Sequence, residues 1–227
     1  VHKPHLDALC HHGNPAEKFT LLLNLPDMKI FGNRVDDLPE TKTSFDLIYH
    51  GTVSRRHGLE IAIQAVLALR EKIKGLRLSI IGEGDDISRL THMVEELNIL
   101  DHVHIRKSVP LDELVGQIKS ADVGVIPLLY DDFTKYMLPV KLLEYVALEI
   151  PVICTRTETI ETYFDNSMIQ YFSSGSATEL ADDILFLYQN PDRRRDLVAN
   201  ASKFNKVYNW EKQKQSYYQL IDALLEK

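Results

Sequence analysis

The segment Asp122-Val-Gly-Val-Ile-Pro127, followed by Asp131-Asp-Phe-Thr-Lys-Tyr-Met-Leu-Pro-Val-Lys-Leu-Leu-Glu-Tyr-Val-Ala147, sets an apolar run ahead of an amphipathic one. Four consecutive apolar or small residues that end at a proline are typical of a buried strand. Pro139 lacks an N–H and has a fixed φ, which suits the first position of a helix. The segment therefore predicts a strand, a loop and then a helix that begins at Pro139.

The predicted start of this helix has features of an anion site. Leu138 is expected at the N-cap, and leucine has no side-chain acceptor for the amides of the first turn. Lys141 and Glu144 are three residues apart and share one helix face. A positive helix end, an ammonium and a carboxylate one turn later suit a phosphate joined to a sugar hydroxyl. The alternative is an exposed Lys–Glu pair on an ordinary amphipathic helix.

Outside this segment, apolar runs alternate with amphipathic ones along most of the chain. Strands are expected at 19–23, 45–50, 76–81, 103–105, 123–126, 151–154 and 169–172. Helices are expected at 4–13, 58–73, 87–97, 111–120, 139–148, 177–189, 192–204 and 210–226, with one helical turn at 160–164 and a polar loop or linker at 32–44. Successive β-α units predict an α/β fold, a doubly wound parallel sheet of the Rossmann-like kind. Ligands of such sheets bind beyond the carboxyl ends of the strands.

Composition narrows the class of protein. The 227 residues are 44% hydrophobic and 26% charged, which is typical of a globular chain with one large or two small domains. A net charge of −7 argues against nucleic acid or an anionic membrane as the main partner. No apolar stretch approaches the ~20 residues of a membrane helix. Two widely spaced cysteines, Cys10 and Cys154, lack metal-ligand spacing and favour a reducing, cytoplasmic location. The chain begins at Val1, so we expect an excised fragment.

The residues that follow the strand at 45–50 are candidates for binding an anion. Gly51 allows a ligand to approach the backbone closely, and Arg55, Arg56 and His57 present up to three positive groups before the next helix. Guanidinium groups match a diphosphate in shape. A solvated basic loop is the alternative reading.

Other strand ends carry weaker signals. Gly82-Glu-Gly-Asp-Asp-Ile87 lacks a third glycine and has three carboxylates, so we reject a nicotinamide site there and expect Asp85 or Asp86 to cap a helix. Arg106 and Lys107 suit the edge of a flat base, or they are ordinary loop residues. We expect no metal site, because Asp131 and Asp132 have no third ligand nearby. His50, His92, His102 and His104 have no repeated ligand spacing and are expected to be ordinary surface or core residues.

Several segments in this order resemble the donor-binding, C-terminal domain of a GT-B glycosyltransferase of family 4, the large retaining "glycosyl transferases group 1" family. The markers are Gly51…His57-Gly58, Ile80-Ile-Gly-Glu-Gly84, Asp101-His-Val-His-Ile105, Ala121-Asp-Val-Gly-Val-Ile-Pro127, Leu138-Pro-Val-Lys-Leu-Leu-Glu-Tyr-Val-Ala147 and Pro151-Val152. The resemblance implies a UDP- or GDP-linked sugar donor, no metal, and no cofactor besides this substrate. It also implies that Glu144 binds the ribose hydroxyls and that the amides around Met137 and Leu138 hold the diphosphate.

The chain departs from this family at four positions. Thr52 and His57 replace the arginine and lysine that the family places around the first loop, so the diphosphate charge falls on Arg55, Arg56 or Lys141. Tyr136 takes the place of the first glutamate of the family's pair. Glu149 replaces a glycine at a helix end where glycine is preferred.

The resemblance also predicts the domain organisation. Residues 1–40 are expected to be the end of an N-terminal domain with its linker, and 41–227 the nucleotide-sugar domain with a helix that crosses back. The acceptor site, the catalytic histidine and any membrane contact would belong to that N-terminal domain, so we expect this fragment alone to be inactive. A noncatalytic nucleotide-binding module and a nucleotide-sugar epimerase of the GT-B fold are the alternatives.

Overall fold

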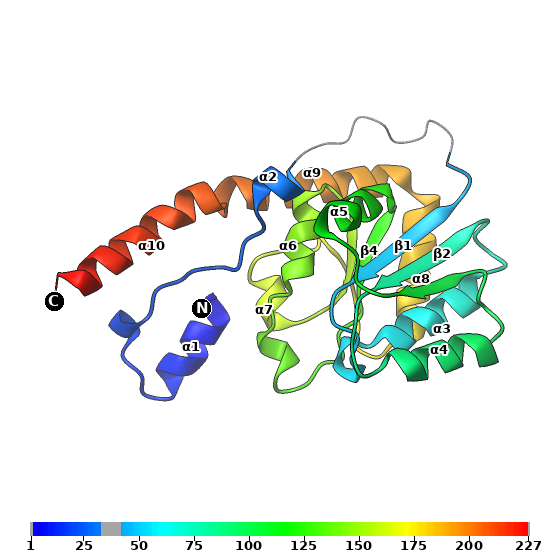
Figure 1. Ribbon diagram of the computed structural model, residues 1–227, viewed down its shortest axis with the longest axis horizontal. Helices are drawn as coiled ribbons and strands as arrows, with labels where there is room; N and C mark the ends of the chain where they lie inside the picture. The colour runs from blue at the N-terminus through cyan, green and yellow to red at the C-terminus, as the bar shows by residue number, and fades with distance from the viewer. Residues whose placement is uncertain (1, 33–41, 227) are drawn as a thin grey trace.

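In the computed structural model, which describes residues 2–32 and 42–226, the described chain forms a six-stranded parallel sheet in the order β3-β2-β1-β4-β5-β6 (Figure 1). The strands are β1 Phe45–His50, β2 Leu76–Ile81, β3 Val103–Arg106, β4 Val123–Ile126, β5 Val152–Thr155 and β6 Gln170–Phe172. This order confirms the predicted doubly wound sheet. Strands β1 and β4 are buried along nearly their whole length, because helices cover both faces.

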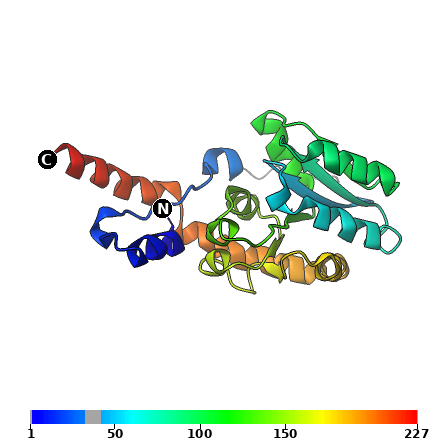
Figure 2. The same ribbon diagram turned by 90° about the horizontal axis from the view of Figure 1, so that it is seen from below.

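Two apolar layers cover the sheet, one on each face (Figures 1 and 2). One layer comprises α3 Leu59–Leu69, α4 Ile87–Glu96 and α8 Ala177–Gln189. The other comprises α5 Leu111–Ser120, α6 Val140–Ala147, the short α7 Glu158–Glu161 and the last turns of α9 Pro191–Val207. The helices that follow β1 and β4 therefore lie on opposite faces.

The N-terminal segment contains α1 Lys3–His11 and α2 Met28–Phe31, and it runs beside α10 Trp210–Leu225, which projects away from the sheet (Figure 1). The strand predicted at 19–23 is wrong, since this stretch is extended but pairs with no described strand. Gln213 supplies the hydrogen bonds instead. The Leu23 amide donates to its Oε1 at 2.7 Å, and its Nε2 donates to the Leu23 carbonyl at 2.6 Å.

Two helix starts differ from the prediction. Pro139 is the N-cap of α6 rather than its first residue, which makes the prediction of Leu138 at the N-cap wrong. Its ψ of 129° keeps it extended, so the helix begins one residue later. Asp86 is the N-cap of α4, but its carboxylate accepts two hydrogen bonds from Arg89 instead of capping the helix. Most of the predicted loop at 32–44 lies outside the described residues.

Gly124, in the middle of β4, allows α6 to pack closely on the sheet. A Cβ at this position would lie 2.5 Å from Cδ2 of Tyr145. The Tyr145 hydroxyl donates to the Ile48 carbonyl at 3.2 Å, which fixes the ring over the strand. Any side chain at position 124 would therefore push α6 away from the sheet.

We expect Gly124→Ala to lower the free energy of unfolding by about 1–3 kcal/mol, because an overpacked core must shift. Gly116→Ala in α5 is the matched control. A Cβ there meets nothing within 4 Å. Alanine is the better helix former, so this control should gain about 0.5–1 kcal/mol. Urea unfolding of both variants checks the pair, and a Gly124→Ala chain as stable as wild type would contradict the packing argument.

Glu149, just after α6, has a φ of 59°, in the left-handed region that glycine prefers. This geometry explains why glycine is the expected residue at such a helix end. We expect Glu149→Gly to stabilise the chain by up to about 1 kcal/mol. Glycine relieves the strain of the positive φ, and the entropy that it adds to the unfolded chain offsets part of this gain. Glu149→Ala removes the same carboxylate but keeps the Cβ, so its midpoint of urea unfolding should not rise.

Candidate functional site

The carboxyl ends of β1 and β4 form the switch point of the sheet, because the helices that follow these neighbouring strands cover opposite faces. Ligands of doubly wound sheets bind at this place. The loops after the two strands touch, since the Leu129 amide donates to the Arg56 carbonyl at 2.9 Å. Gly58 permits this contact. It has a φ of 63°, and a Cβ there would lie 1.9 Å from the Pro127 carbonyl oxygen.

Lys141, in the first turn of α6, reaches back under the loop that follows β1. Its Nζ donates to the Tyr49 hydroxyl at 3.2 Å and lies 4.5 Å from the centre of that ring. The Tyr49 hydroxyl in turn donates to the Thr52 carbonyl at 2.5 Å. A Cβ at Gly51 would lie 3.6 Å from Nζ. Burial lowers the pKa of Lys141 to about 8, against the opposing effect of Glu144.

Glu144, one turn further along α6, lies over the end of β1. Its side chain is 16% exposed, and Oε2 is 3.2 Å from Nε2 of His50, the last residue of that strand. Burial raises the pKa of Glu144, and the Lys141 ammonium opposes the shift. The structure thus brings Gly51, Thr52, Lys141 and Glu144 together, and adds Tyr49 and His50.

The basic loop differs from the prediction of three positive groups. His57 is buried, and burial together with Lys141 and Arg56 lowers its pKa to about 4, so it is neutral at pH 7. Its Nδ1 is hydrogen-bonded to the Ser54 hydroxyl at 2.9 Å. Arg56 lies over the Phe133 ring at 4.7 Å and thereby joins the loops that follow β1 and β4. Arg55 is 79% exposed, with Nε 3.9 Å from Asp86, and remains open to a ligand.

The turn before α6 already uses backbone groups that were expected to bind the diphosphate. The Met137 amide donates to the Thr134 carbonyl at 2.9 Å, so it is already paired. The Tyr136 carbonyl lies 2.6 Å from Nε2 of His2 in the N-terminal segment, while the Tyr136 ring is partly exposed. Leu138 is half-buried. The N-cap residue of α6 makes no side-chain hydrogen bond to the helix. The Leu142 amide of the first turn donates to the Pro139 carbonyl at 3.0 Å, so only the amides before it are candidates for an external acceptor.

Asp131, one half of the possible metal pair, has another role. Its carboxylate accepts from the amides of Phe133 and Thr134 and so holds the turn before α6. Asp132 instead pairs with Lys135 at 2.6 Å. Within residues 2–32 and 42–226, no group of three or more His, Cys, Asp or Glu side chains is placed to hold a metal ion.

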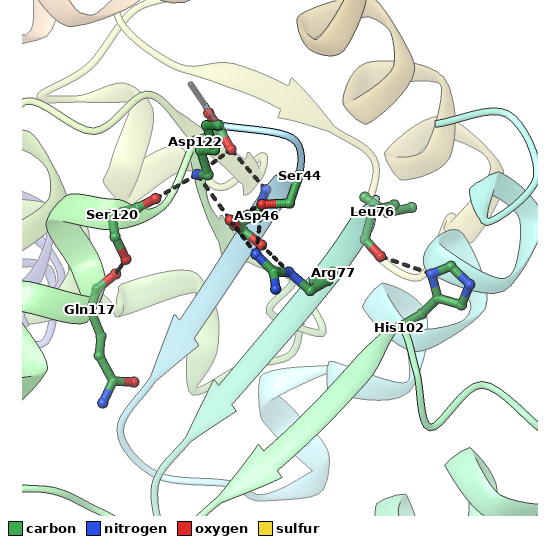
Figure 3. A network of polar contacts seen from close by, with 9 residues as sticks. Ser44, Asp46, Leu76, Arg77, His102, Gln117, Ser120 and Asp122 are labelled. Atoms are coloured by element: carbon green, nitrogen blue, oxygen red, sulfur yellow. Dashed lines mark hydrogen bonds and ion pairs between the residues drawn. The ribbon is translucent and has the colours of Figure 1, made fainter. Parts of the chain in front are cut away.

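Arg106 and Lys107 lie at the end of β3, where Arg106 donates to Gln117 of α5 at 2.9 Å. Arg106 also lines a cavity of about 610 Å³ over the faces of β1, β2 and β3. At the amino ends of these strands the cavity meets a polar network in which Asp46 pairs with Arg77 at 2.7 Å (Figure 3). Figure 3 shows Ser44 and Asp122 in the same network. This network is structural and lies at the opposite end of the sheet from Glu144.

A family model described as "Glycosyl transferases group 1" matches residues 33–204, more than half of the chain. The chain belongs to this family. The predicted resemblance is therefore confirmed, including the GT-B type of domain.

Curated relatives match only part of their own length. The chain is 30% identical over 144 residues to the putative colanic acid biosynthesis glycosyltransferase WcaL of Escherichia coli, covering 63% of this chain and 35% of that protein. It is 25% identical over 191 residues to the D-inositol 3-phosphate glycosyltransferase of Paenarthrobacter aurescens, covering 80% and 46%. The chain thus spans less than half the length of these relatives.

Solved structures support the fold. Anabaena HepE in complex with UDP and glucose superposes with a TM-score of 0.80 at 13% identity, over 96% of this chain and 60% of that one. The C-terminal domain of the group 1 glycosyl transferase LpcC from Francisella tularensis gives 0.64 at 17% identity, over 80% of this chain and 97% of that domain. No helix in the described part of the chain has the length and apolar character needed to cross a membrane.

Two residues of the site, Tyr49 and His50, were not expected to take part. The sequence pattern predicts an ordinary surface or core role for His50, and it places Tyr49 as a residue inside a strand. The signal that could have found His50 is its position, one residue before the strand-end glycine that was already a candidate. Because side chains alternate along a strand, residue 50 must face α6 if residue 49 faces α3.

Proposed function

We propose that this chain is the donor-binding domain of a retaining, metal-independent glycosyltransferase, which takes a sugar from a UDP- or GDP-linked donor. The acceptor site would lie on an N-terminal domain of the same protein. One observation carries the proposal: Lys141 and Glu144, on successive turns of α6, both reach the end of β1 at the switch point, where Lys141 lies beside Gly51 and Glu144 beside His50. The UDP and glucose named with HepE, a protein of the same fold, support a donor of this class.

The site suits the loss of a nucleoside diphosphate from an anomeric carbon. Negative charge grows on the leaving oxygen, and groups that stabilise it more in the transition state than in the ground state accelerate the step. Lys141 would supply a buried cation beside Gly51, and Arg55 would supply an exposed one. The start of α6 would supply backbone amides. Glu144 would accept hydrogen bonds from the pentose. These residues supply the charge stabilisation that a metal ion would otherwise give.

Calorimetric titration with UDP, GDP, UMP and GMP tests the donor site. We expect UDP or GDP to bind in the millimolar range or better, and the corresponding monophosphate to bind at least about tenfold more weakly because it lacks the second phosphate. If neither diphosphate binds in that range, the proposal fails.

A noncatalytic nucleotide-binding module is a second candidate, and Tyr136 favours it. A tyrosine stands where the family has the first glutamate of its pair, and its ring stacks on His5 with centroids 6.1 Å apart. Transfer of labelled sugar from a nucleotide sugar by the full-length protein distinguishes the two. Binding without transfer supports the module, whereas transfer supports the glycosyltransferase.

A further inference from the structure

His50 is held rigidly at the end of β1. Only 6% of the residue is exposed, and its ring stands edge-on to the Tyr145 ring, with centroids 5.2 Å apart and planes at 85°. Tyr145 is itself fixed by its hydrogen bond to the Ile48 carbonyl. The imidazole is therefore confined between the end of β1 and α6.

The Nε2 atom of His50 is buried and, within the described part of the chain, has no hydrogen-bond partner of good geometry. Oε2 of Glu144 lies 3.2 Å from it. Burial and the nearby Lys141 lower the pKa of His50 to about 3, so the ring is neutral at pH 7. A neutral imidazole carries one N–H, which either nitrogen can hold. A buried polar atom without a partner is costly, so the small rotation that directs an Nε2–H to Glu144 is favourable.

We propose that His50 is a positioning residue for the donor site: its Nε2–H donates to Oε2 of Glu144 and leaves Oε1 directed at the two hydroxyls of a nucleotide pentose. Nε2 itself is too buried to touch a ligand, so it acts through the carboxylate. A glutamate side chain has three rotatable bonds, and a fixed second oxygen removes much of that freedom before the ligand arrives. This inference rests on the proposed function.

Two nearly isosteric variants test whether the Nε2–H of His50 is needed for UDP binding. His50→Gln keeps an amide N–H near the position of Nε2, whereas His50→Met replaces it with an apolar group of similar shape. We expect His50→Met to weaken UDP binding about tenfold and His50→Gln to change it less than about twofold. Binding of 2′,3′-dideoxy-UDP, which lacks the hydroxyls, should be the same in both variants and in wild type. Equal UDP affinity in the two variants would overturn the inference, as would equal losses for UDP and the dideoxy analogue.

Two further measurements keep the test decisive. Glu144→Ala is titrated alongside. If wild type binds neither UDP nor GDP, or if Glu144→Ala binds the preferred diphosphate as well as wild type, the proposed function fails. If Glu144 matters and His50→Met does not, only the role of His50 fails. In case His50→Met does not fold, imidazole ¹⁵N spectra of the wild-type chain report the tautomer directly. A proton on Nε2 of His50 is expected, and a proton on Nδ1 would overturn the inference.

Discussion

Lys141→Met is expected to stabilise the chain at pH 7 and to weaken its affinity for UDP. The Lys141 pKa falls from 10.5 to about 8 because the ammonium is buried. A pKa that is lower by one in the folded chain than in the unfolded chain corresponds to about 1.4 kcal/mol, so the buried charge lowers stability by up to about 3 kcal/mol. The variant also loses the contact of the ammonium with the Tyr49 ring, so we expect a net gain of about 1–2 kcal/mol.

The pH dependence of this gain has a definite sign. The unfolded chain holds the Lys141 proton more tightly than the folded chain, so the penalty is fully present below pH 8. It fades as the pH rises from 8 to 10.5, where the lysine is neutral in both states. Urea unfolding of wild type and Lys141→Met should therefore differ most at pH 7 and least near pH 10.5. Lys74→Met, at an exposed lysine, should change stability by less than about 0.5 kcal/mol at either pH.

The same charge is expected to bind the diphosphate. A cation in a low-dielectric site interacts strongly with an anion that reaches it. Lys141→Met should therefore lose at least about tenfold in UDP affinity at pH 7. In wild type, UDP affinity should fall as the pH rises above 8, since the ammonium loses its proton. If Lys141→Met gains stability but keeps its UDP affinity, Lys141 takes no part in donor binding.

The sheet was predictable because its information is local. The bounds of β1, β2 and β4 match the predicted strands, since each consists mainly of buried apolar residues. The same reasoning failed at 19–23, which has a strand-like composition but no neighbouring strand. Whether an extended segment pairs depends on what lies beside it, and here that is a side chain of α10, Gln213.

The position of the candidate site could be predicted from the sequence, but the protonation states of its residues could not. Glycines and basic residues after strands pointed to the switch point, and α6 was placed to within one residue. The burial of His57, which makes it neutral, depends on helix packing that no local pattern encodes. His50 and Glu144, which lie side by side in the structure, are 94 positions apart in the sequence (144 minus 50). Such contacts follow from topology, once the sheet order is known.

Glu144→Ala is expected to lower UDP affinity about 10- to 100-fold. Hydrogen bonds to a charged group contribute about 1.5–3 kcal/mol, and tenfold in affinity corresponds to about 1.4 kcal/mol. Removal of this carboxylate also takes away a neighbour that raises the Lys141 pKa, so the diphosphate end of the site changes too. A loss of affinity for UDP alone would not show which part of the ligand Glu144 contacts.

Comparison of UDP with 2′,3′-dideoxy-UDP separates the two effects. If Glu144 binds the pentose hydroxyls, wild type should prefer UDP by about 10-fold or more, and Glu144→Ala should bind both nucleotides alike. Any loss that acts through Lys141 lowers both affinities equally and cancels in the ratio. A preference for UDP that survives Glu144→Ala would place the pentose elsewhere. Lys141 would then still mark an anion site at the end of β1, but the assignment of that site to a nucleotide would be wrong.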